Sequence, residues 1–244
     1  MDGFDLSSSH QWSLAPIVGL EHPLLVFDPH ILMHTWIILA ILLACLLVAR
    51  WFLAQKKGIG HFLALSYVKF FIDLCNQSLG SFSFSHVAFI TTLFTFIALC
   101  NIISIIPWLE EPTKDLNTTL ALGLIAFIYT QATAIKKFGL RAYIHEYFAP
   151  FFIMFPLHVV GKLASIMSIS FRLFGNIFGG YMISNIYFST IQGSWLFETI
   201  GLVTGLNMLI IVFFSLFEGL LQAFVFTMLS LTYLSIAFNG EGDN

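Results

Sequence analysis

The stretch LASIMSISFRLFGNIFGG, residues Leu163 to Gly180, carries a single charge, Arg172, in the middle of an apolar run. A charge at the centre of a bilayer costs from about 2.5 to more than 10 kcal/mol, so it usually marks a functional site. Because arginine does not deprotonate in proteins, it would be a permanent positive charge and not a proton relay. An arginine that snorkels to the lipid headgroups is the alternative, and its distance from both ends of the run argues against it.

The whole chain has the composition of an integral membrane protein. It has 244 residues, of which 58% are hydrophobic and 9% are charged, and its mean hydropathy is +0.91. A soluble domain carries roughly 25% charged residues. The net charge of −3 gives no indication of nucleic-acid binding. The three cysteines show no CxxC spacing, which argues against a thiol metal site, and the first thirty residues lack the pattern of a cleavable signal peptide.

Upstream of Arg172 the sequence predicts three upright spanning helices and one surface helix. Ile31–Leu53, His86–Leu109 and Thr119–Ile135 are apolar and long enough to cross a bilayer, which takes about 20 residues. Ile59–Leu79 instead gathers its apolar residues on one face, which is typical of an amphipathic helix on the membrane surface. Basic residues follow the first and third spans, so the positive-inside rule predicts an external N-terminus and a cytoplasmic C-terminus.

The C-terminal third predicts a hairpin of two long helices joined by a turn at residues 192–194. Its two apolar segments are Pro156–Ser189 and Trp195–Phe238, and the second would be roughly 65 Å long as one helix. A hydrocarbon core of about 30 Å accommodates such a helix only if it is strongly tilted or broken. The candidate breaks are Gly179–Gly180 and either Gly201 or Gly205.

These segments predict a single all-α membrane domain over residues 1–244. It comprises an N-terminal segment at 1–30, the upright and surface helices at 31–141, and the long tilted hairpin at 150–238. We find no internal repeat. A secondary transporter would usually show two similar halves, so this class is disfavoured.

Small residues form a stripe around Arg172. Residues on this stripe recur every three or four positions, which places them on one face of a helix; they are Ser165, Ser168, Arg172, Gly175 and Gly179. Such a stripe allows another helix to approach closely, although on spacing alone a static helix–helix contact is the more frequent explanation. Asn176 lies one turn after Arg172 and could hydrogen-bond to a partner.

The last long segment supplies a second group of polar residues. Ser215, Glu218 and Gln222 fall on one helical face. A carboxylate in an apolar environment has a raised pKa, which suits a group that takes up and releases protons. A structural role for Glu218, as the ion-pair partner of Arg172, remains the alternative. A plain anchoring subunit would need neither of these residues.

The histidines give no indication of a metal or a cofactor. His30 and His34 are one turn apart but have no further ligands nearby, and His145–Glu146 lacks the second histidine of HExxH. A haem-binding subunit would need histidines paired across mid-membrane helices, and only His158 is near such a depth. His158 lies fourteen residues before Arg172 and could titrate near neutral pH.

Two motifs resemble the signatures of the F-type ATP synthase subunit a family. They are SFRLFGN, Ser170 to Asn176, and LQAFVFTML, Leu221 to Leu229. The spacing of Asn101 to Pro107 and the segment DLNTTL, Asp115 to Leu120, are weaker matches to the same family. The resemblance extends from about His22 to Phe238.

This resemblance implies a stator subunit that carries protons past a rotating ring. Arg172 would face the carboxylates of the c-subunit ring, with Asn176 and Gln222 as its polar neighbours, between two offset aqueous half-channels. The subunit would have no catalytic site and no cofactor. Its partners would be the c-ring, the peripheral-stalk b subunits, the lipid bilayer and, indirectly, the F1 head. A bacterial inner membrane fits best, with an organelle inner membrane as the alternative, and the choice between H⁺ and Na⁺ stays open.

The chain departs from the family pattern along the proton path. Many members carry an acidic residue or histidine nine residues after the arginine, where this chain has Tyr181, and a histidine or glutamate at the position of Ser215. His158 replaces the usual acidic residue before the arginine. Glu218 is therefore the candidate to take over the role of relay in the outer half-channel.

Overall fold

The computed structural model describes residues 12–13, 26–27, 29–55, 58–105, 111–141, 143, 154–191, 209 and 212–239. Within these residues the chain is helical apart from short connecting segments and one short strand pairing, in which β1 (Trp12–Ser13) lies antiparallel to β2 (Val26–Phe27). The helices are α2 (Pro29–Ala54), α3 (Ile59–Leu79), α4 (Phe84–Ile102), α5 (Leu116–Phe138), α7 (Met154–Ile191) and α10 (Gly219–Asn239), with the short turns η2 (Ile103–Ile105), η3 (Pro112–Lys114) and η4 (Phe213–Glu218).

Five of the described helices are long and apolar enough to cross a membrane, namely α2, α4, α5, α7 and α10. This confirms the prediction of an all-α protein with several spanning helices. The surface helix predicted at Ile59–Leu79 coincides with α3, which is not one of the five. That α3 lies on the membrane surface remains a prediction.

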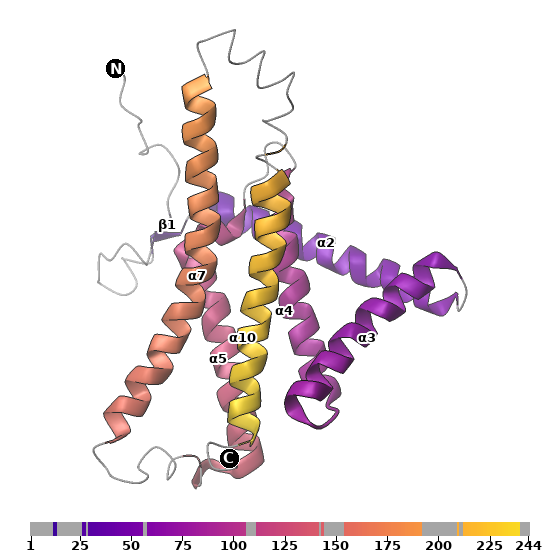
Figure 1. Cartoon of the computed structure of the whole chain (residues 1–244), viewed down its shortest axis with the longest axis vertical. Coiled ribbons are helices and arrows are strands. Elements are labelled where there is room, and N and C mark those ends of the chain that lie inside the picture. The colour runs from indigo at the N-terminus through magenta and orange to yellow at the C-terminus, as the bar shows by residue number, and fades with distance from the viewer. Residues whose placement is uncertain are drawn as a thin grey trace.

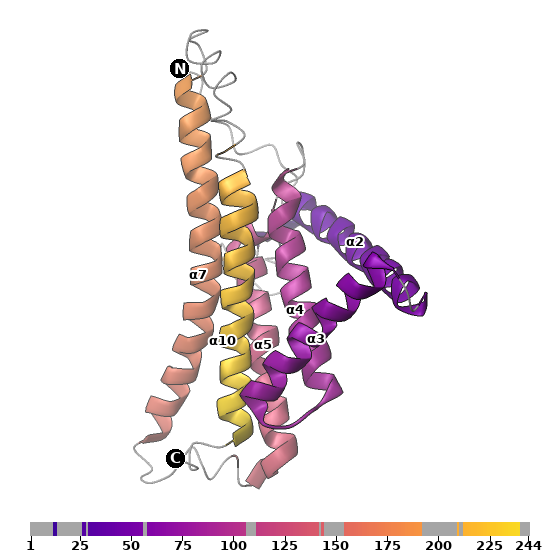
Figure 2. The same ribbon diagram turned by 45° about the vertical axis from the view of Figure 1, so that its right-hand side comes forward.

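Four helices form a bundle, and two leave it. Figures 1 and 2 show α4, α5, α7 and α10 side by side along the long axis, whereas α2 and α3 are inclined away from them. The four helices share a core of buried apolar side chains; they are Leu93, Ile97, Ala98, Leu122, Ala126, Ile169, Leu173, Ile177, Ala223 and Phe226. The predicted upright helices at α4 and α5 are therefore packed with the hairpin helices more than with α2.

α3 joins the bundle through its C-terminal half. Its buried residues Phe71, Cys75 and Leu79 pack against α4 and against Leu231 and Leu234 of α10. Its first turns instead expose large apolar side chains, which are Ile59, Phe62 and Leu63.

α7 is one continuous helix of 38 residues, about 57 Å long at 1.5 Å per residue. The break considered at Gly179–Gly180 does not occur, because the helix runs through both residues. Gly180 is buried, and a Cβ placed on it would lie 2.9 Å from the ring of Phe214, so the glycine permits close contact between the two helices. The other candidate break, at Gly201 or Gly205, lies outside the described residues, as does the predicted turn at 192–194.

The second spanning helix ends earlier than predicted. The sequence placed its end at Leu109, whereas α4 ends at Ile102 and the chain tightens into the 3₁₀ turn η2. The apolar run itself continues past Asn101, and Pro107 supplies the physical reason, because a proline in a helix clashes with the carbonyl four residues earlier, here that of Ile103. Residues 106–110 lie outside the described part.

Candidate functional site

A hydrogen bond between two amide side chains joins the two long helices. The Nδ2 atom of Asn176 on α7 donates to Oε1 of Gln222 on α10, at 2.7 Å. Gln222 is 1% exposed, and its Nε2 atom has no partner within the described residues. A buried amide that lacks a partner is costly, so this pair marks a polar spot inside an apolar bundle. The structure thus brings together two residues that are 46 positions apart in the sequence and that the family resemblance implied as polar neighbours of Arg172.

Arg172 lies one turn before Asn176 and is exposed on the surface of α7. Among the described residues it has no hydrogen bond and no ion-pair partner, and in particular none with Glu218. The alternative that Glu218 serves as the structural partner of Arg172 is therefore not seen. A permanent charge at this depth needs an opposite charge or water nearby, and the described part of this chain places no opposite charge beside it.

The small-residue stripe lies on the same open surface as Arg172. Ser168 and Gly175 are exposed, and a Cβ placed on Gly175 or Gly179 would meet no atom within 4 Å. No described helix of this chain occupies the stripe at those two glycines. With respect to the described residues, the stripe is therefore open to the close approach of another helix.

The remaining predicted residues are divided between the two ends of the bundle. α7 and α10 run in opposite directions, as the Asn176–Gln222 bond and the contact of Gly180 with Phe214 show. Glu218 and Tyr181 therefore both lie beyond the amide pair, toward one end of the bundle. His158 lies on α7 toward the other end, more than three turns before Arg172.

Glu218 is partly buried and has no hydrogen-bond or ion-pair partner among the described residues. It is the last residue of η4, a turn of π-helix that leads into α10. Such turns occur frequently at functional sites. Ser215 is in the same turn, and only its backbone is described.

The ring of Tyr181 contacts a cationic side chain, that of Lys114. The Nζ atom of Lys114 in η3 lies 5.0 Å from the centre of the tyrosine ring, within the range of a cation–π interaction. The residue that replaces an acidic group or histidine thus lies beside a positive charge. The sequence alone did not indicate this contact.

A second polar contact near Glu218 was also missed by sequence reasoning. Asn101 at the end of α4 donates from Nδ2 to the carbonyl oxygen of Gly219, and its Oδ1 accepts a hydrogen bond from Thr113, both at 2.8 Å. The sequence had shown Asn101 as a lone amide in an apolar run and its spacing to Pro107 as a weak family match, but neither signal indicated its partners.

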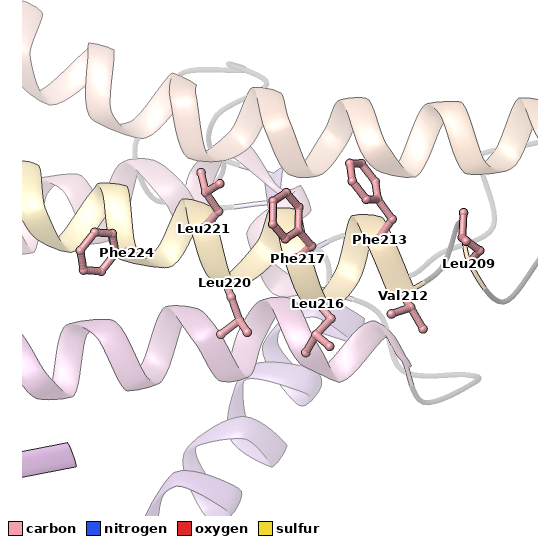
Figure 3. Close-up of a pocket in the computed structure, with 8 residues that line it drawn as sticks. All are labelled: Leu209, Val212, Phe213, Leu216, Phe217, Leu220, Leu221 and Phe224. Carbon is pink, nitrogen blue, oxygen red and sulfur yellow. The ribbon is translucent and has the colours of Figure 1, made fainter. Parts of the chain in front are cut away.

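An apolar groove runs along η4 and the first turns of α10. It is lined by Leu209, Val212, Phe213, Leu216, Phe217, Leu220, Leu221 and Phe224, and Figure 3 shows how these side chains spread to different sides of the helix. Phe213 and Phe217 stack with their ring centres 5.4 Å apart. No lining side chain is polar, so the groove suits an apolar surface and could not orient a polar cofactor.

The five helices that can cross a membrane define a multi-pass membrane protein, and its two long C-terminal helices carry Arg172, the partly buried amide pair and Glu218. A family model described as ATP synthase A chain matches residues 32–235. The chain belongs to this family. It is 36% identical over 209 residues to the ATP synthase subunit a of Moorella thermoacetica, an alignment that covers 85% of this chain and 90% of that protein.

Two further relatives show the same name at lower identity. The ATP synthase subunit a 2 of Acaryochloris marina is 29% identical over 221 residues, covering 87% of each chain. The protein of the same name from Chlorobium luteolum is 29% identical over 248 residues, covering 96% of this chain and 70% of the relative.

Family membership confirms the class inferred from the two signature motifs. The chain is a multi-pass membrane protein of a family whose members are subunits of the ATP synthase complex, act in proton transport through its membrane sector and have no catalytic site of their own. The roles of the individual residues are a separate question.

Proposed function

We propose that Arg172 is the fixed charge that a rotating ring of c subunits passes, and that it couples proton flow to rotation and ATP synthesis. One observation carries this proposal: Arg172 is exposed at mid-span on a stripe of small residues and has no partner in the described chain. Its charge therefore calls for a carboxylate on a neighbouring molecule that can approach closely.

The position of the polar residues supports two offset half-channels. Glu218 and Tyr181 lie on one side of the Asn176–Gln222 pair, and His158 lies on the other side, toward the opposite end of α7. A proton would reach the ring on one side by way of Glu218 and leave on the other side near His158. Arg172, between the two routes, opposes direct passage because a second positive charge is costly at a low-dielectric site.

The same reasoning assigns roles to the amide pair and to Ser215. Asn176, the partly exposed member of the pair, offers a polar group one turn from Arg172, where a carboxylate of the ring could be solvated as it releases its proton. Buried Gln222 holds the Asn176 amide in place. Ser215 lies in the turn that carries Glu218 and would serve the outer route with it.

The partners and the membrane follow from the family. We infer that the chain contacts the c-ring through the face of Arg172, that peripheral-stalk b subunits hold it still, and that it acts on the F1 head only through these parts. The relatives above come from bacteria, so the bacterial plasma membrane is the proposed location.

The test first removes the charge of Arg172 and then replaces it with a cation that can lose its proton. Arg172→Ala is expected to abolish coupled ATP synthesis in membrane vesicles and to open a passive proton leak. Arg172→Lys is expected not to restore synthesis, because an ammonium group loses its proton more readily when it is desolvated. ATP synthesis and passive proton flux are measured in vesicles that carry each variant.

The matched control is Arg141→Ala, which removes an exposed arginine three residues beyond the end of α5, outside the apolar span. It is expected to synthesise ATP at the rate of the unmodified complex. Normal synthesis by the Arg172→Ala complex would refute the proposed role of this residue.

A further inference from the structure

A buried polar chain connects three elements next to Glu218. Asn101 and Thr113 are both 0% exposed. The hydroxyl of Thr113 in η3 donates to Oδ1 of Asn101, and Nδ2 of Asn101 donates to the backbone carbonyl of Gly219, each at 2.8 Å. Gly219 is the first residue of α10 and directly follows Glu218. This series of hydrogen bonds therefore ends at the residue next to Glu218.

The contact of Asn101 with α10 is as close as the backbone permits. A Cβ placed on Gly219 would lie 2.8 Å from Cβ of Asn101, a distance that real Cβ atoms essentially never show. Because glycine has no Cβ, the amide of Asn101 can reach the carbonyl directly. The rotation of α10 about its own axis is thereby fixed at this residue.

The position of the π turn along the chain decides the direction in which Glu218 projects from the helix. η4 covers Phe213–Glu218, and the N–H of Gly219 donates to the carbonyls of Phe214 and Leu216. A π turn holds an extra residue, and each residue of an α-helix turns the chain by about 100°. If the π turn moved along the chain toward Gln222, Glu218 would rotate by about that angle, away from the face that carries Gln222.

We propose that Asn101 and Thr113 are positioning residues, which lock the π turn in front of Gly219 and so keep Glu218 on the face of α10 that bears Gln222. This inference rests on the proposed function of Glu218 as the outer proton relay.

A purely structural role would not require polar groups at this contact. Burying an amide and a hydroxyl costs free energy that their mutual hydrogen bonds only just offset, whereas two apolar side chains would pack here without that cost. A fully bonded buried network does, however, specify one arrangement of the elements it joins. Here the network specifies the arrangement of η4, which among the described turns is the one that carries a carboxylate, Glu218, next to the Asn176–Gln222 pair.

The experiment removes the hydroxyl of Thr113 in the intact ATP synthase. Thr113→Val keeps the shape of the side chain and breaks its bond to Asn101. ATP-driven proton pumping is expected to fall about two- to tenfold, the kinetic equivalent of one lost hydrogen bond. Thr113→Ser keeps the hydroxyl and is expected to restore pumping. Thr113→Ala, which also lacks the hydroxyl, repeats the test if the valine variant assembles in reduced amount.

A double variant separates positioning from general stability. In a Glu218→Gln background the relay is already absent, so Thr113→Val is expected to cause no further loss of pumping. A structural defect would instead lower pumping by the same factor in both backgrounds, because independent effects add. Pumping is normalised to the amount of assembled complex in every case.

The control is Thr130→Val, which removes a buried hydroxyl bonded to the Ala126 carbonyl of its own helix. It is expected to pump normally. Normal pumping by Thr113→Val alongside slow pumping by Glu218→Gln would overturn the positioning role only. Normal pumping by Glu218→Gln would overturn the relay role of Glu218 and the positioning role together. If Thr113→Val lowers pumping by the same factor with and without Glu218→Gln, Thr113 has a structural role only.

Discussion

Arg172 and Asn101 show two different ways in which one polar side chain is accommodated among apolar helices. Asn101 is 0% exposed, and its amide is bonded to Thr113 and to the carbonyl of Gly219. Arg172 is exposed and has no partner in the described part of the chain. The first residue is thus satisfied by its own protein, whereas the second depends on another molecule. In the sequence both are single polar residues within an apolar run.

At the same scale, Gly219 provides a test of the close contact between α4 and α10. Gly219→Ala would normally favour a helix by up to about 1 kcal/mol, but its new Cβ would lie 2.8 Å from Cβ of Asn101. Overpacking of this kind costs about 1–3 kcal/mol, because neither Cβ can move without its backbone. We expect a lower thermal midpoint for the purified complex.

Gly161→Ala is the matched control for this substitution. Gly161 is an exposed glycine of α7, and a Cβ placed on it meets no atom within 4 Å. Its replacement is expected to leave the midpoint unchanged or to raise it slightly. Equal midpoints for the two variants would show that α4 and α10 are not in close contact at Gly219.

At the scale of single elements, α10 is held at both ends by other helices. Its first residue accepts the hydrogen bond of Asn101, and at its last turn Nζ of Lys137 donates to the carbonyl of Phe238 and lies 3.6 Å from the centre of that ring. A cation at a helix C-terminus satisfies an otherwise unpaired carbonyl and opposes the negative end of the helix dipole. The two contacts together fix the position of α10 along the bundle.

Lys137→Met is therefore expected to loosen the last turn of α10. The loss of an exposed cationic cap and a cation–π contact amounts to about 0.5–2 kcal/mol. Backbone amides of the last turn of α10 should exchange with deuterium several-fold faster, which mass spectrometry of the purified complex would detect. Lys136→Met, the same change at the exposed neighbouring residue, should leave their exchange unaltered. Identical exchange in both variants would contradict the capping role.

The lengths of the elements were predictable in part. Long apolar runs identified the segments of α2, α5 and α7 to within a few residues, because a spanning helix must be about 20 residues long. Run length did not give the end of α4, because the apolar run continues past Ile102. It left α7 either tilted or broken, and the structure shows one helix through Gly179–Gly180. The contacts of Asn101 and Gly180 were not predictable either, because they depend on what lies opposite in another element.

At the scale of the whole molecule, the bundle has two distinct ends. α5 and α10 end together at the contact of Lys137 with Phe238, where the basic residues of α5 gather. The positive-inside rule predicts that this end faces the cytoplasm. An odd number of crossings, such as the five that the described helices permit, would place the N-terminus on the opposite side.

Cysteine labelling can test this orientation. Asp2→Cys and Asp243→Cys, both outside the described residues, are introduced separately and treated with a membrane-impermeant maleimide on sealed inverted vesicles. The Asp243→Cys variant should react at once, and the Asp2→Cys variant only after the vesicles are opened. Reaction of both from the same side would refute the predicted topology.

The three native cysteines must not react with the maleimide in this experiment. Cys45 is exposed and is replaced by serine in all variants. Cys75 and Cys100 are buried and can be kept. Burial also raises the pKa of the Cys75 thiol, so little reactive thiolate is present at neutral pH.

Composition and the length of the apolar runs were enough to predict a helical membrane protein, the segments that can cross the bilayer and the isolated charge of Arg172 at mid-span. The contacts between distant residues follow only from the packed helices, such as those of Asn176 with Gln222 and of Asn101 with Gly219, 118 positions away. In a soluble protein the apolar face of a helix reveals its inner side. Here lipid-facing and core-facing residues are both apolar, so the sequence pattern does not show how each helix is rotated against its neighbours, and close packing with hydrogen bonds decides it.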